Sequence, residues 1–219
     1  MSKLILSIFI LFALSACNTF DLYQNIIQTN LNYSKQSKIE ITSQIKNMPY
    51  AMQLAEYQNN QSILVLSNAD KKYLSWVDGD NNILTTFNGK IVESTGLLNN
   101  IEIVNPPNLN NILNNLINDL SNKVKHSSLI RFSTPKTTYL ELSLSYSFHS
   151  IDPIIFVKKI NQNQIKVWLL REDFFVHTID WKGSNFYWIS ENGEVVKSKQ
   201  YIAPNLDRFY LETIKKYNN

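Results

Sequence analysis

The chain has 219 residues, with 21 basic and 18 acidic side chains, three histidines and one cysteine. Because the charges are nearly balanced and no basic block occurs, the composition argues against a nucleic-acid partner. A single cysteine excludes an internal disulfide, so a hydrophobic core must supply the stability, and the length suffices for one sizeable domain.

The first sixteen residues have the pattern of a secretory signal. Lys3 gives a short basic start, an apolar run covers 4–14, and the small residues Ser15 and Ala16 follow. The run is roughly half of the ~20 residues that a membrane-spanning helix needs. We therefore expect residues 1–16 to be a cleaved lipoprotein signal peptide, with an ordinary signal peptide and an incidental cysteine as the alternative.

Cys17 ends this leader in the sequence Leu14-Ser15-Ala16-Cys17, which resembles the bacterial lipobox. In that motif cleavage occurs before the cysteine, whose sulfur carries diacylglycerol and whose new amino group is acylated. Several acyl chains hold a protein firmly on a membrane without crossing it. Asn18 follows, instead of the aspartate typical of inner-membrane retention, so we expect a lipid anchor at Cys17 on the periplasmic face of the outer membrane.

The polar segment 17–47 carries Leu22, Ile26, Ile27 and Leu31 in loose helical spacing and is interpreted as a tether with short helices. A single domain is expected over 48–219. It opens with short β-patterned runs separated by turn residues, at 51–57, 62–66, 73–77, 83–87 and 90–94. Asn88-Gly89 is the sharpest turn signal, because a two-residue type I′ turn needs positive φ at both positions.

Residues 107–125 interrupt the β pattern. Apolar residues recur there at steps of three and four while asparagines fill the other face, which predicts an amphipathic helix. Strand patterns resume afterwards, at 129–132, 139–149, 154–160, 165–170 and 174–179. Within 139–149 apolar and polar residues alternate strictly, which predicts a strand with one buried face and one solvent-exposed face.

The segment 186–200 predicts a hairpin. If Asn192-Gly193 is a two-residue loop, Trp188 lies opposite Lys197 and Phe186 opposite Lys199, which would place two lysines over aromatic rings. A three-residue loop would shift this register. A short helix is predicted over 206–217. The fold class is therefore mainly β: an antiparallel meander curled into a barrel-like or sandwich sheet, with an inserted amphipathic helix and short terminal helices.

Catalytic patterns are absent from the sequence. His126, His149 and His177 have no ligand spacing, and the five glycines suit turns better than a phosphate loop. Glu172 and Asp173 are adjacent, so on a strand they point to opposite faces and do not form a ready acid/base pair. We expect no metal, no cofactor and no enzymatic activity.

Two stretches resemble the YjbF family of group 4 capsule polysaccharide lipoproteins. The first, from MPYAMQLAEY to NGKIVESTGL, carries Pro49, Tyr50, Trp76, Gly89, Lys90 and Gly96 at family-motif positions; the second, FYWISENGEVVKSKQYIAP, carries Trp188, Ser198, Gln200 and Pro204. Lys90 stands where the family pattern has arginine. The resemblance implies a barrel-like fold and a non-enzymatic outer-membrane lipoprotein whose partners are other envelope proteins of exopolysaccharide or capsule export.

The residues themselves leave two further functional hypotheses open. The protein could be a periplasmic glycan-binding module, in which exposed aromatic rings stack on sugars; Trp76, Trp188, Lys197 and Lys199 are the candidate glycan or partner surface. The alternative interpretation of the tryptophans is that they pack in the hydrophobic core. A periplasmic hydrolase would instead need a cleft with two carboxylates.

Overall fold

The computed structural model describes residues 48–58, 60–97, 99–118, 124–134, 137–157, 164–204 and 206–217. Their twelve strands form a closed antiparallel barrel in which each strand pairs with its neighbours in the chain and β1 pairs with β12. The expected meander is thus confirmed, and the sheet closes as a barrel instead of splitting into a sandwich. The predicted tether and N-terminal helices lie outside the described residues.

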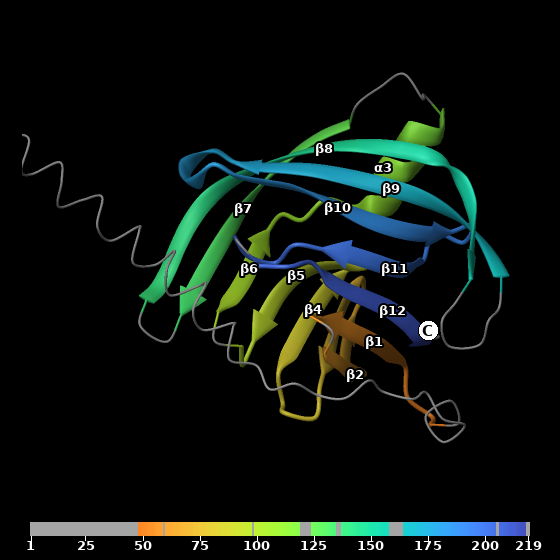
Figure 1. Ribbon diagram of the computed structural model, residues 1–219, viewed down its shortest axis with the longest axis horizontal. Coiled ribbons are helices and arrows are strands. Elements are labelled where there is room, and N and C mark those ends of the chain that lie inside the picture. The colour runs from red at the N-terminus through yellow and green to blue at the C-terminus, as the bar shows by residue number, and fades with distance from the viewer. Residues whose placement is uncertain are drawn as a thin grey trace, which may run out of the picture.

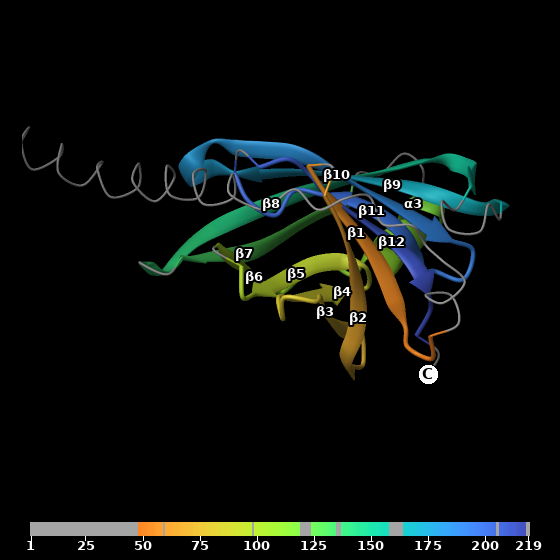
Figure 2. The ribbon, with the colours of Figure 1, turned by 60° about the horizontal axis from the view of Figure 1, so that its bottom comes forward.

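The elements follow one another in the order β1 Met52–Tyr57, β2 Asn60–Asp70, β3 Tyr73–Val77, β4 Ile83–Phe87, β5 Lys90–Thr95, β6 Asn100–Val104, α3 Leu109–Asn118, β7 Val124–Thr134, β8 Thr137–Val157, β9 Gln164–Val176, the 3-10 turn η1 His177–Ile179, β10 Trp181–Ser190, β11 Val195–Gln200 and β12 Phe209–Lys215. Figures 1 and 2 show the long strands β8 and β9 arching over one side of the barrel, with strands β2 to β5 on the other.

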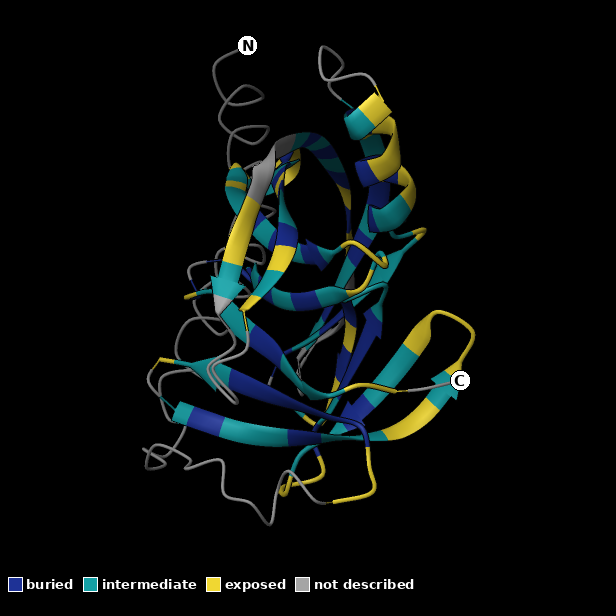
Figure 3. Cartoon of the chain, turned by 90° about the vertical axis from the view of Figure 1, so that its right-hand side faces the viewer, coloured by how far each residue is buried: buried dark blue, intermediate teal, exposed yellow. Residues whose placement is uncertain are grey.

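The core fills the inside of the barrel. Along β8, the buried residues Leu142, Leu144, Tyr146 and Phe148 alternate with more exposed polar ones, as the sequence pattern predicts. Figure 3 shows the same alternation of buried and exposed positions around the wall and on α3. The helix buries Leu109, Ile112, Leu113 and Leu116 and packs against β7 and β8. No helix among the described residues is long and apolar enough to cross a membrane.

The predicted helix over 206–217 is wrong, because β12 occupies Phe209–Lys215. This segment pairs with β11 on one side and β1 on the other, and it closes the barrel. Leu211 and Glu212 are buried, and Tyr210 pairs with Lys199 across the ladder between β11 and β12. Two open sheet edges therefore override the local helical preference.

Other boundaries also differ from the sequence prediction. The helix predicted over 107–125 spans only Leu109–Asn118 among the described residues, and Val124 already pairs with Phe148 in β7. The segments predicted at 165–170 and 174–179 belong largely to one continuous strand, β9. β6 was not predicted, although Ile101 and Ile103 alternate with the polar Asn100 and Glu102. Long cross-strand ladders, which sequence windows do not reveal, decide these boundaries.

Both predicted turns carry informative geometry. Asn88 and Gly89 have φ of 49° and 82°, as a type I′ turn requires. In the second hairpin the loop has three residues, since Ser190 N–H donates to Glu194 O and Gly193 N–H to Ser190 O. A register shift beside Trp188 then restores the predicted pairs Trp188↔Lys197 and Phe186↔Lys199.

Candidate functional site

A buried polar network crosses the inside of the barrel. Lys90, at the start of β5, places its Nζ 2.8 Å and 2.9 Å from the two carboxylate oxygens of Glu172 in β9. Lys90 is 2% exposed and Glu172 is 0% exposed. The ammonium also lies 4.7 Å from the ring centroid of Tyr146. An ion pair of this kind fastens two strands that are far apart in the sequence.

Tyr187 and Asn185 in β10 complete the surroundings of Glu172. The Asn185 amide donates to Glu172 Oε1 at 2.6 Å, and the Tyr187 hydroxyl lies 3.2 Å from Oε2. Burial lowers the pKa of Lys90, while the charge of Glu172 and its hydrogen bonds act in the opposite direction. Burial, followed by the negative charge of Glu172, raises the pKa of Tyr187 and of Tyr146 well above their usual value.

Gln200 joins this network to the β4–β5 turn. Its Nε2 donates to Gly89 O at 2.9 Å and to Ser198 Oγ at 2.8 Å, and its Oε1 accepts from Ile91 N–H at 2.9 Å. Four residues singled out from the sequence, Gly89, Lys90, Ser198 and Gln200, therefore meet inside the barrel. Pro49 and Tyr50 lie apart, before β1, and Tyr50 is 58% exposed. Gly96 follows β5, with a φ of 87°.

Sequence reasoning missed Glu172, Asn185 and Tyr187 as members of this network. Their side chains meet because Asn185 pairs with Glu172 and Tyr187 pairs with Ser198 across the strands. The available signal was the position of Glu172 beside Asp173, which predicts that one carboxylate points inwards and the other outwards. The structure has this arrangement: Glu172 is buried, whereas the side chain of Asp173 is one-third exposed.

Asp173 belongs to a separate outer cluster. Partial burial alone would raise the pKa of Asp173. Hydrogen bonds from Ser184 at 2.6 Å and Arg171 at 2.8 Å outweigh this effect, so the pKa lies below its usual value. His149 Nε2 lies 3.2 Å from Asp173 and 3.5 Å from Ser147 Oγ. Since the same ring nitrogen faces both groups, the cluster lacks the relay of a serine hydrolase. Among the described residues, no group of three or more His, Cys, Asp or Glu side chains could hold a metal ion.

The predicted aromatic surface is only partly realised. Lys197 Nζ lies 5.2 Å from the ring centroid of Trp188, as the register predicts. Lys199 instead lies over Tyr210 at 4.8 Å, and Arg208 covers Phe186 at 5.3 Å.

The assignment of Trp76 to this surface is wrong. Its side chain is only 2% exposed, packs in the core and donates from Nε1 to Thr86 Oγ1 at 3.0 Å. Trp188 lies on the outer face of β10, next to the inward-pointing Tyr187. The two tryptophans therefore do not form one stacking platform.

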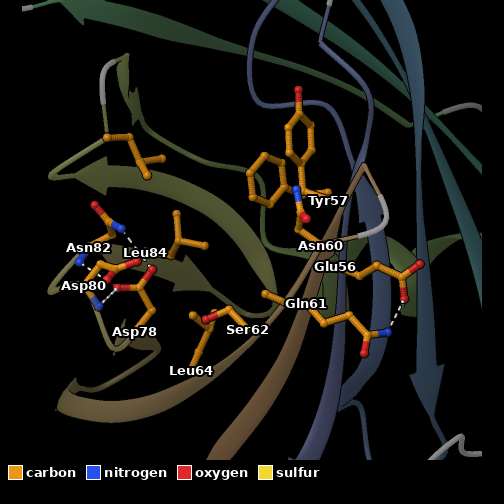
Figure 4. Close-up of a pocket in the computed structure, with 13 residues that line it drawn as sticks. Glu56, Tyr57, Asn60, Gln61, Ser62, Leu64, Asp78, Asp80, Asn82 and Leu84 are labelled. Atoms are coloured by element: carbon orange, nitrogen blue, oxygen red, sulfur yellow. Dashed lines mark hydrogen bonds between the residues drawn. The ribbon is translucent and has the colours of Figure 1, made fainter. Parts of the chain in front are cut away.

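One end of the barrel carries an acidic mouth, a cavity of about 110 Å³ lined by the β1–β2 and β3–β4 turns, Leu97 after β5 and the start of β12. Figure 4 shows Asp78, Asp80 and Asn82 on one side of it and Glu56 and Gln61 on the other. The Asp78 carboxylate forms hydrogen bonds within its own turn, where its Oδ1 accepts from Asp80 N–H and Asn82 N–H at 2.9 Å. This volume is below the ~300 Å³ at which ligand pockets usually begin.

The fold and its interior define a class of protein: a closed up-and-down barrel whose lumen is plugged by a core and a buried ion-pair network. The sequence matches the YjbF family, described as group 4 capsule polysaccharide lipoprotein gfcB, YjbF, over residues 22–214. The chain therefore belongs to this family of capsule-related lipoproteins, which are anchored to a membrane of the cell envelope.

Solved structures with similar folds include the lipoprotein YmcC from Escherichia coli, at 18% identity and a TM-score of 0.69, covering 85% of this chain and 100% of YmcC. Weaker matches include an exported Bacteroides fragilis protein with a YmcC-like fold, at 9% identity and a TM-score of 0.35, covering 75% of this chain and 93% of that one. A lipoprotein from Parabacteroides distasonis matches at 9% identity and a TM-score of 0.34, covering 75% of this chain and 92% of that one. At these identities YmcC supports the fold alone. No curated protein sequence matches this chain significantly.

Proposed function

We propose that this protein is a non-enzymatic accessory factor in the assembly or export of an exopolysaccharide or capsule, held by lipid at Cys17 on the periplasmic face of the outer membrane. The observation that supports the role is the family match over residues 22–214. The lipobox-like leader and Asn18 support the anchor and its location. The buried core that fills the inside of the barrel is consistent with a factor that contacts partners or glycan at its surface and mouths.

The test is complementation of a deletion strain with measurement of surface and cell-retained polysaccharide. Wild type is expected to restore the surface polysaccharide, and Cys17→Ala is not, because the protein then lacks its acyl chains. Asn18→Asp serves as a matched variant: it keeps the lipid and should move the protein to the inner membrane, as membrane fractionation would show. Unchanged surface polysaccharide in the deletion strain would reject the role, and full activity of Cys17→Ala would reject the need for the anchor.

Direct glycan binding is the second candidate, in a form that does not depend on exposed tryptophans. What favours it is a larger cavity at the other end of the barrel, where three buried side-chain amide atoms have no hydrogen-bond partner among the described residues.

A further inference from the structure

The end of the barrel opposite the acidic mouth carries a second cavity, here called the basic mouth. Because successive strands run antiparallel, the turns alternate between the two ends. A cavity of about 300 Å³ at this end is therefore lined by the β2–β3, β4–β5 and β10–β11 turns, the start of α3 and the end of β12. That volume reaches the lower bound of ordinary small-molecule sites.

The rim of this mouth is positively charged. Four lysines and a single glutamate line it: Lys71, Lys72, Lys215, Lys216 and Glu194. Lys216 is paired with Glu194, and Lys215 Nζ donates to Met48 O at 2.6 Å. Lys71 and Lys72 are exposed, and no ion pair joins them to a carboxylate among the residues that the structure describes. The rim thus attracts anions, whereas the acidic mouth repels them.

The walls of the basic mouth contain three side-chain amide atoms without hydrogen-bond partners among the described residues: Gln53 Oε1, Asn88 Nδ2 and Asn110 Oδ1. Each of these atoms is buried, and Gln53 as a residue is only 8% exposed. Buried polar atoms are normally paired, and leaving them unpaired destabilises the fold. The cavity therefore offers two hydrogen-bond acceptors and one donor to the polar groups of a ligand.

The protein also fixes the positions of these amides. Asn88 lies in the type I′ turn, and Gln200 holds this turn from across the barrel through Gly89 O. Asn110 lies against Gly193 of the β10–β11 turn, where an added Cβ would come within 3.2 Å of the Asn110 amide nitrogen. A preorganised set of this kind favours a ligand of fixed shape, because little ordering remains to be done on binding.

We propose that the basic mouth binds an acidic sugar residue of a polysaccharide chain, with its carboxylate at Lys72 and Lys71 and its hydroxyls on the amides of Gln53, Asn88 and Asn110. Sugar hydroxyls both donate and accept, which matches a mixed set of amide donors and acceptors, and a carboxylate matches an ammonium. This inference rests on the proposed polysaccharide role and names the ligand class. An anionic membrane surface would engage the lysines alone and leave the buried amides unsatisfied.

The experiment titrates the full-length lipoprotein in neutral detergent with a galacturonic acid tetrasaccharide, and with a neutral galactose tetrasaccharide as the matched ligand. The acidic tetrasaccharide should bind at least about tenfold more tightly, and the difference should shrink at high salt. Asn88→Gly removes the amide yet keeps the positive-φ turn, and Gln53→Leu replaces an unpaired acceptor by an apolar group; each should weaken binding about tenfold. Melting curves establish that both variants fold.

Charge is tested by Lys72→Ala against Lys182→Ala, a matched removal of an exposed lysine on β10. Lys72 is preferred to Lys71, whose φ of 55° would strain an alanine. Only Lys72→Ala should weaken binding. Failure of the acidic ligand to bind, equal binding of the neutral one, or full affinity in folded Asn88→Gly and Gln53→Leu would each overturn the proposal.

Vesicles containing phosphatidylglycerol separate the membrane alternative. Binding to vesicles that depends on Lys72 but not on Asn88 or Gln53, without tetrasaccharide binding, would assign the basic mouth to lipid and overturn the inference. The outcomes are distinguishable from those of the complementation test. Loss of polysaccharide export in the deletion strain with no tetrasaccharide binding would reject this inference alone, whereas binding with no export phenotype would reject only the proposed role.

Discussion

The ion pair inside the barrel allows a quantitative test through Glu172→Gln. This change keeps the size of the side chain but removes the charge that faces Lys90 at 2.8 Å. At an effective dielectric constant of about 20, the Coulomb attraction over this distance is about 6 kcal/mol. Breaking a buried pair by removing one partner typically costs about 3–5 kcal/mol, because the remaining charge is left uncompensated.

The protonation of Lys90 sets an upper limit on this loss. Starting from the ordinary lysine pKa of 10.5, discharging the ammonium at pH 7 costs about 4.8 kcal/mol, and at pH 9 only about 2 kcal/mol. Burial lowers the pKa of Lys90 in the folded state, so the unfolded chain binds more protons between that pKa and 10.5, and the stability of the variant rises with pH. We expect Glu172→Gln to lose about 3–5 kcal/mol at pH 7 and about 2 kcal/mol at pH 9.

Urea unfolding followed by tryptophan fluorescence measures these losses. The double variant Lys90→Met/Glu172→Gln is the matched control, because no net charge then remains buried, and it should recover most of the stability. A loss below about 1 kcal/mol for Glu172→Gln, or a double variant no more stable than the single one, would refute the reasoning.

Two further predictions concern residues that contact this network. Burial and Glu172 raise the pKa of Tyr187, so its contribution to stability is present below pH 10 and is lost as the pH rises above it. Tyr187→Phe should reduce the alkaline slope of the unfolding free energy by up to about 1.4 kcal/mol per pH unit between pH 10 and 11, and an unchanged slope would contradict the assigned burial. Gly89→Ala places a Cβ 2.3 Å from Val195 Cβ at a positive φ and should lower the free energy of unfolding by about 2–4 kcal/mol. Gly79→Ala, with open space around it, should change that free energy by less than about 0.5 kcal/mol, and equal effects of the two alanines would show that the close approach is not what constrains Gly89.

The sequence by itself determined the local features, because these depend on a few adjacent residues. The Asn88-Gly89 turn, the alternation that buries Leu142 and Leu144, and the amphipathic stripe of α3 follow from backbone preference and periodicity. The opposite orientations of Glu172 and Asp173 follow from the same two-residue period. Family membership was also visible from motif order and spacing.

Tertiary structure alone decided what the distant segments do. Residues 209–215 form a strand because the barrel offers two edges to pair with, and Trp76 is buried because its strand turns it into the core. The pairing of Lys90 with Glu172 and the gathering of four lysines at one mouth depend on ring closure, which brings together residues far apart in the chain. Sequence periodicity specifies which face a residue occupies, whereas only the closed register specifies what that face meets.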